Sequence, residues 1–255
     1  FSGNMGVLDE TIINIVILQC VVLAISTIVG IVAFGFAMAM TPFFLLFLDA
    51  KMVVEINLIL TFVLFTLIFF RSGRHVDTKL MSVLLLGGLV GIGPGVALIY
   101  FANETFLRIL LIVVVLGTAV FATRNQQSLF KKPKHVTFIV GATFAVFKAS
   151  MALGGPILAI FALNQRWSSR ETRAFLSCFF MVIDAIIIMS HGLVGILGIH
   201  ELKVSVLFVP PLLMGNFISS LIVRSMNERI FRRLMFIALM LSSSIVLFRQ
   251  IIEYV

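Results

Sequence analysis

The stretch that decides the fold is residues 136–162, VTFIVGATFAVFKASMALGGPILAIFA. It is apolar and long enough to cross a bilayer, which takes about 20 residues. It nevertheless carries Lys148 in its interior and is interrupted by Gly154-Gly155-Pro156. Proline suits the first position of a helix, where its missing N–H would have no partner anyway. The stretch therefore predicts two helices separated by a break inside the membrane.

The composition around this stretch indicates an all-α polytopic membrane protein. Hydrophobic residues make up 61% of the chain and charged residues 12%, against about 45–50% and about 25% in soluble domains. Extended disorder, a disulfide scaffold and a nucleic-acid-binding domain are excluded. The apolar segments are residues 12–48, 53–70, 80–101, 105–123, 136–162, 174–199, 204–223 and 230–248.

Segment 12–48 is the second unusual one, because it is far too long for a single crossing. Gly30, Gly35 and Pro42 interrupt it. We expect a half-helix to begin at Pro42, with Thr41 placed to cap it.

The basic residues favour a topology in which these two segments turn back. Cytoplasmic loops collect Lys and Arg, yet eight simple spans would place nine of them on each side. If 12–48 and 136–162 each enter and leave on the same side, the distribution becomes fourteen against four, with Lys148 inside the membrane. We expect six crossings plus two re-entrant hairpins, and eight simple spans are the alternative.

Weak internal matches predict a duplication. Asn103-Glu104 with Arg108 recurs as Asn227-Glu228 with Arg232, and Pro42 pairs with Pro156. One hairpin plus three helices turns the second copy upside down, and inverted repeats are typical of secondary transporters. The expected parts are a tail (1–11, with 1–4 a cloning remnant before Met5), repeat 1 (12–123), a basic cytoplasmic linker (124–135) and repeat 2 (136–255).

The predicted binding site lies where the two half-helices begin, because helix N-termini favour anions. Lys148 would neutralise the anion or change protonation state together with it, unless it snorkels to a headgroup. Both proline sites could also be simple packing kinks. Asn57 could line the cavity, whereas Glu55 is expected to be solvated near the interface. The substrate-binding candidates are Thr41, Pro42, Asn57, Lys148, Gly154, Gly155 and Pro156.

Two further residues are candidates for proton coupling. Asp184 stands in mid-span, where it could carry protons or pair with Lys148, either functionally or only structurally. His191 lies two helical turns further along the same face, and the alternative for it is simple packing. Arg166, Arg170 and Arg173 could attract anions or merely anchor the topology.

The sequence predicts no metal site, cofactor or enzyme chemistry. Cys20 and Cys178 are expected to be free thiols, since neither belongs to a C-x-x-C or Cys/His cluster. A phosphate-binding loop and a serine–histidine–aspartate pattern are also missing from the sequence.

The chain resembles the TauE/SafE family of sulfite and organosulfur-anion exporters, once a family of unknown function, over about residues 17–252. The resemblance implies transport of small sulfur-containing oxyanions across the inner or plasma membrane without a cofactor. Family members often have a glycine-rich run before the first-half proline, but residues 34–40 here hold only Gly35. The resemblance is carried by Thr41-Pro42, the loop 71–79, Gly87-Gly88 with Gly91-Ile-Gly93, Gly141, Ala152-Leu-Gly154-Gly155-Pro156, the Arg-rich loop, Pro210-Pro211 with Gly215, and Phe231-Arg232.

We therefore expect a secondary transporter of small anions that works by alternating access around paired half-helix N-termini, with proton coupling left open. Its expected partners are the anion and the bilayer; a homo-oligomer is left open. The alternatives are a non-transporting membrane scaffold or assembly factor, and an intramembrane enzyme with Asp184 and His191 as acid and base.

Overall fold

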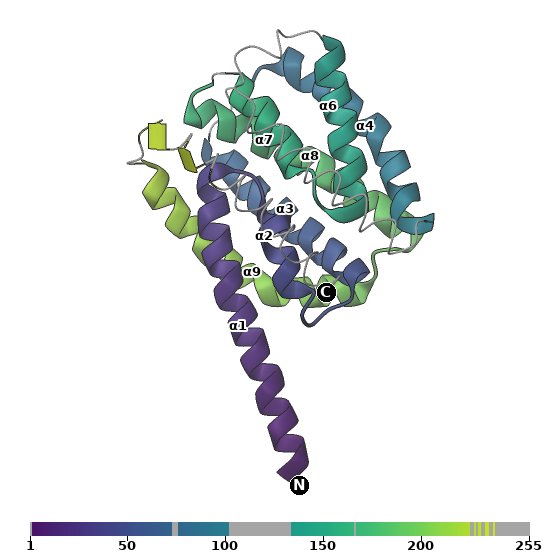
Figure 1. Cartoon of the computed structure of the whole chain (residues 1–255), viewed down its shortest axis with the longest axis vertical. Helices are drawn as coiled ribbons and strands as arrows, with labels where there is room; N and C mark the ends of the chain where they lie inside the picture. Colours follow the sequence, from purple (N-terminus) through teal and green to yellow (C-terminus); the bar gives the residue numbers. More distant parts are fainter. Residues whose placement is uncertain are drawn as a thin grey trace, which may run out of the picture.

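The structure is a computed structural model that describes residues 2–72, 76–101, 134–165 and 167–224, together with residues 227, 229, 230, 233, 234 and 237. Within these residues every regular element is a helix, so the all-α prediction is confirmed (Figure 1). The helices are α1 (Ser2–Val32), α2 (Phe36–Phe44), α3 (Ala50–Ser72), α4 (Thr78–Phe101), α6 (Lys134–Met151), α7 (Gly155–Asn164), α8 (Ser169–Val194) and α9 (Ile199–Arg224).

Five helices are long and apolar enough to cross a membrane, which confirms the polytopic class. They are α3, α4, α8, the Ile13–Val32 part of α1 and the Ile199–Val223 part of α9. Several predicted segments lie outside the described residues. They are the span 105–123, most of the linker 124–135 and of the span 230–248, and the matched residues Asn103, Glu104 and Glu228.

Both unusual segments are broken, as predicted. α1 gives way to α2 across residues 33–35, and α6 gives way to α7 across residues 152–154. Each break starts with an alanine in the left-handed region, Ala33 at φ 61° and Ala152 at φ 59°. This conformation is costly for a residue with a side chain, so surrounding packing must hold both turns. α1 alone is long enough to cross, so the first hairpin does not consist of two short arms.

The predicted start of the first half-helix was wrong by several residues. α2 begins at Phe36, after Gly35 at φ 89°, and Pro42 lies inside it. Gly35 adopts that φ without steric cost, whereas Pro42 only removes one hydrogen bond near the end of a short helix. Thr41 caps nothing: its hydroxyl donates to the Ala37 carbonyl at 2.6 Å.

Glycines bring the helices of the two halves into close contact. Gly215 on α9 lies against Ser26 on α1, and Gly91 on α4 lies against Ala142 on α6, where an added Cβ would collide. Small residues of this kind let membrane helices approach closely. Figure 1 shows α4 beside α6 and α1 crossing α9.

α3 and α8 pack against each other at the centre, in antiparallel orientation. Phe65 stacks on Phe180 at a centroid distance of 4.1 Å, and Thr61 contacts Asp184 one turn away. The polar groups that matter for function lie along this contact. The inverted duplication itself stays a prediction.

Candidate functional site

α2 and α7, the helices that follow the two breaks, begin close together at a small pocket. A Cβ added to Gly155, the first residue of α7, would lie 3.2 Å from the backbone nitrogen of Gly35, the N-cap of α2. The first N–H groups of a helix have no partner within the helix and carry its positive dipole end. The pocket is lined by Gly35, Phe36, Ala37, Met38, Thr61, Phe65, Lys148, Ala152, Gly155 and Phe180.

Lys148 lines this pocket and is paired there with a carboxylate. Its side chain is 1% exposed, and its Nζ lies 3.3 Å from Asp184 Oδ1. The Nζ also donates to the Thr61 hydroxyl at 3.0 Å and lies 5.2 Å from the centre of the Phe180 ring. The alternative in which Lys148 snorkels to a headgroup is therefore wrong.

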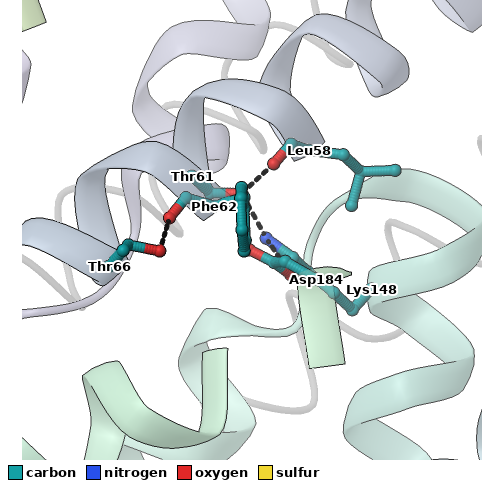
Figure 2. Close-up of polar contacts among 6 residues, drawn as sticks. All are labelled: Leu58, Thr61, Phe62, Thr66, Lys148 and Asp184. Atoms are coloured by element: carbon teal, nitrogen blue, oxygen red, sulfur yellow. Dashed lines mark hydrogen bonds and ion pairs between the residues drawn. The ribbon is translucent and has the colours of Figure 1, made fainter. Parts of the chain in front are cut away.

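Thr61 links the two charges, as Figure 2 shows. Its hydroxyl oxygen lies 2.8 Å from Asp184 Oδ2 and 3.0 Å from the Leu58 carbonyl. A hydroxyl has one proton to donate, so Thr61 accepts from Lys148 and donates to either oxygen. Asp184 Oδ1 has no hydrogen-bond partner beyond its ion pair with Lys148. Asp184 is therefore paired with Lys148, one of the two roles considered for it.

A second buried polar pair lies further along α3 and α8. His191 Nδ1 and Glu55 Oε1 are 2.7 Å apart, and their side chains are 0% and 1% exposed. The prediction that Glu55 is solvated was wrong, because α8 covers it and supplies a partner. Neither Glu55 Oε2 nor His191 Nε2 has a hydrogen-bond partner. The recorded contacts of Asp184 are with Lys148 and Thr61, whereas His191 contacts Glu55.

The other predicted residues lie around the pocket rather than in its lining. Asn57 Nδ2 donates to the Thr41 hydroxyl at 3.1 Å, which ties α3 to α2. Gly154 is the N-cap of α7 and packs on the Phe144 ring. Pro156 lies in the first turn of α7, as predicted, and Pro42 lies near the end of α2.

Of the predicted binding residues, Lys148 and Gly155 line the pocket, and Asp184 contacts Lys148. Sequence reasoning missed Thr61 and the start of α2. Gly35 could have indicated where α2 begins. Thr61 is a threonine within an apolar span, and nothing in the sequence marks it as a functional residue.

No group of three metal-ligating side chains occurs in the described part of the chain. Cys20 and Cys178 are both free.

Comparison with known proteins gives one match. The sequence model of the family described as "Sulfite exporter TauE/SafE" matches residues 18–246, nearly the whole chain. Searches of curated proteins and of solved structures find no match. The family consists of membrane transporters, which agrees with the five apolar helices. The resemblance seen in the sequence is thus confirmed, and the chain belongs to the sulfite exporter TauE/SafE family of multi-pass membrane transporters.

Proposed function

We propose that this chain is a secondary transporter that carries a small sulfur-containing oxyanion, such as sulfite or sulfoacetate, across the inner or plasma membrane. The observation that carries the proposal is the convergence of two helix N-termini and Lys148 on one buried pocket. An anion there would accept hydrogen bonds from the first N–H groups of α2 and α7 while it lies close to the Lys148 ammonium.

The charges around the pocket are those expected for binding of an anion together with a proton on Asp184. Each helix N-terminus is equivalent to roughly half a positive charge, and Lys148 and Asp184 cancel when both are ionised. The pocket then offers roughly one positive charge, which balances a monoanion. Protonation of Asp184 would release Lys148 for a second negative charge, so Asp184 is the residue we expect to couple proton and anion movement.

His191 and Glu55 would provide a second proton site on the same α3–α8 contact. Both side chains are buried and each keeps one polar atom without a hydrogen-bond partner. Groups of this kind inside a membrane protein mark proton relays. We expect Glu55→Gln to alter the pH dependence of flux while sulfite binding persists.

Alternating access would come from movement of the two halves around the pocket. α2 and α3 belong to the predicted first repeat, and α6, α7 and α8 belong to the second. The pocket lining draws on both. Rocking of one half against the other would expose the helix N-termini first to one side of the membrane and then to the other.

Sulfite flux into proteoliposomes tests the proposal. Lys148→Met should abolish flux, and Lys79→Met is the matched control because Lys79 is an exposed lysine in the first turn of α4. Carboxylates of similar size serve as substrate controls. A folded Lys148→Met protein with wild-type flux would remove Lys148 from the mechanism.

A further inference from the structure

Three arginines lie where α9 passes the C-terminal ends of α1 and α3 and the N-terminal end of α8, away from the pocket. Arg71 Nη1 donates to the Asn216 carbonyl at 3.2 Å, and Arg170 Nε donates to the Ser72 carbonyl at 2.9 Å. Arg173 Nη2 donates to the Gly30 carbonyl at 2.8 Å. Gly30 itself packs against Asn216 and Ser219 of α9, so these contacts share one location.

Among the described residues, no acidic side chain is recorded as an ion-pair partner of the arginine cluster (Arg71, Arg170 and Arg173). The acceptors above are neutral backbone carbonyls, and in the described part of the chain the recorded ion pairs involve other residues. Arg173 is 7% exposed, whereas Arg71 and Arg170 are exposed. A buried cation without a counter-ion is costly, which calls for a negative partner.

The residues that make these contacts also carry hydrogen-bond donors that lack acceptors. Arg173 Nε, Asn216 Nδ2 and the Ser72 hydroxyl are buried and have no hydrogen-bond partner. Asn216 is 1% exposed and Ser72 is 6% exposed. Buried polar groups in folded proteins are nearly always paired, and donors near two guanidinium groups match the acceptor oxygens of an oxyanion.

Helix capping explains only part of this arrangement. Arg173 and Arg170 cap the last turns of α1 and α3, where carbonyls lack helical partners. Capping uses one donor of each guanidinium and requires neither the unpaired Arg173 Nε nor a third cation. Glu171, the nearest acid in sequence, forms the capping box of α8 with Ser168.

We propose that the arginine cluster, with Ser72 and Asn216, forms a second oxyanion-binding site at the predicted cytoplasmic end of the bundle. Arg173 and Asp184 are eleven residues apart on α8, or about 16 Å along the helix axis, so this site is distinct from the pocket. Its ligand is a small oxyanion or the phosphate of an anionic lipid headgroup, which present the same acceptors. A role in holding the substrate before it enters the pocket rests on the proposed function, whereas the binding of an oxyanion at this site does not.

Calorimetric titration of the full chain with sulfite in lipid-free detergent tests the site. Arg71→Gln and Arg173→Gln should each weaken one class of bound sulfite by about tenfold or more, because each removes a charged donor. Lys79→Gln, which removes a positive charge outside the cluster, should leave both classes unchanged. Arg71 is exposed, so its variant keeps the test valid if Arg173→Gln does not fold.

A local probe assigns the binding to the cluster. The single tryptophan of the chain, Trp167, lies just before α8 and packs on Phe175 at 4.5 Å. Sulfite should change its fluorescence in the wild type and in Lys148→Met, but much less in Arg71→Gln. The proposal is overturned if sulfite affinity is unchanged in both arginine variants, if Lys79→Gln lowers it equally, or if no second class of sites exists.

Repeating the titration with phosphatidylglycerol or phosphatidylcholine present distinguishes a lipid phosphate from a free anion as the ligand. Competition by phosphatidylglycerol alone, lost in Arg71→Gln, identifies the lipid phosphate; no competition identifies the free anion. Failure of the pocket proposal is detected by a different measurement, because sulfite flux would then persist in Lys148→Met.

Discussion

Replacement of Asp184 by leucine should destabilise the protein strongly, because it leaves Lys148 buried without a counter-charge. At the observed separation of 3.3 Å, two unit charges attract each other by about 5 kcal/mol at an effective dielectric constant of about 20. Removal of one partner of a buried pair typically costs about 3–5 kcal/mol. We expect a loss of that size in Asp184→Leu and in Lys148→Met.

The double variant separates a structural role from a functional one. Lys148→Met combined with Asp184→Leu leaves no charge unpaired, and apolar replacement of a buried pair is often neutral or stabilising. Thermal unfolding in detergent should therefore show both single variants melting roughly 10 °C lower, with most of the loss recovered in the double variant.

Sulfite flux in the same proteins decides between the roles. The double variant should be folded and inactive, because the pocket has lost its cation. Additive destabilisation in the double variant would show that the two side chains do not interact as the structure has them. Sulfite flux in the double variant would mean that the pair serves only stability.

Three further predictions concern packing, hydrogen bonding and topology. Gly91→Ala should destabilise the protein by more than 1 kcal/mol in thermal unfolding, since its Cβ would collide with the α6 backbone, whereas Gly93→Ala has open space and should be nearly neutral. Thr61→Val should lower sulfite flux and cost about 1–3 kcal/mol of stability through two lost hydrogen bonds, and Thr61→Ser should retain both properties. Single cysteines at positions 49 and 165 should be labelled from opposite sides of the membrane; labelling from one side would disprove the inverted duplication.

The second break was predictable because its sequence is unambiguous. Gly154-Gly155-Pro156 combines residues that end one helix with the residue that best begins the next, and α7 starts there. The first break was mispredicted because two signals competed and proline was given more weight than glycine. Gly35 needs a positive φ, and this conformational demand determined where α2 begins.

The buried polar network could be predicted only in part. Lys148 and Asp184 stand out because charges within apolar runs need partners, and they proved to be each other's partner. Glu55 and His191 are 136 positions apart in sequence, and nothing local to Glu55 distinguishes a solvated acid at a helix start from a buried one. The antiparallel contact of α3 and α8 decides this, and it is a property of the tertiary fold.

The helix contacts are consistent with the predicted inverted duplication, which rested on weak sequence matches alone. α1 packs in parallel on α9 through Gly30 and Gly215, and α6 packs in parallel on α4 through Gly141 and Gly91. The first helix of each predicted repeat thus lies against the last described helix of the other, whereas α3 and α8 pair antiparallel across the centre.

Exchange of the two halves by a two-fold axis in the membrane plane would produce this pattern of parallel and antiparallel contacts. Such an axis would pass between α3 and α8 and would superpose the break at Ala33 on the break at Ala152. Pro42 would then have no counterpart in Pro156, and the shared element would be the left-handed turn itself. Because that turn needs tertiary packing more than it needs a particular residue, its two copies can diverge in sequence while their helix N-termini still face the same pocket.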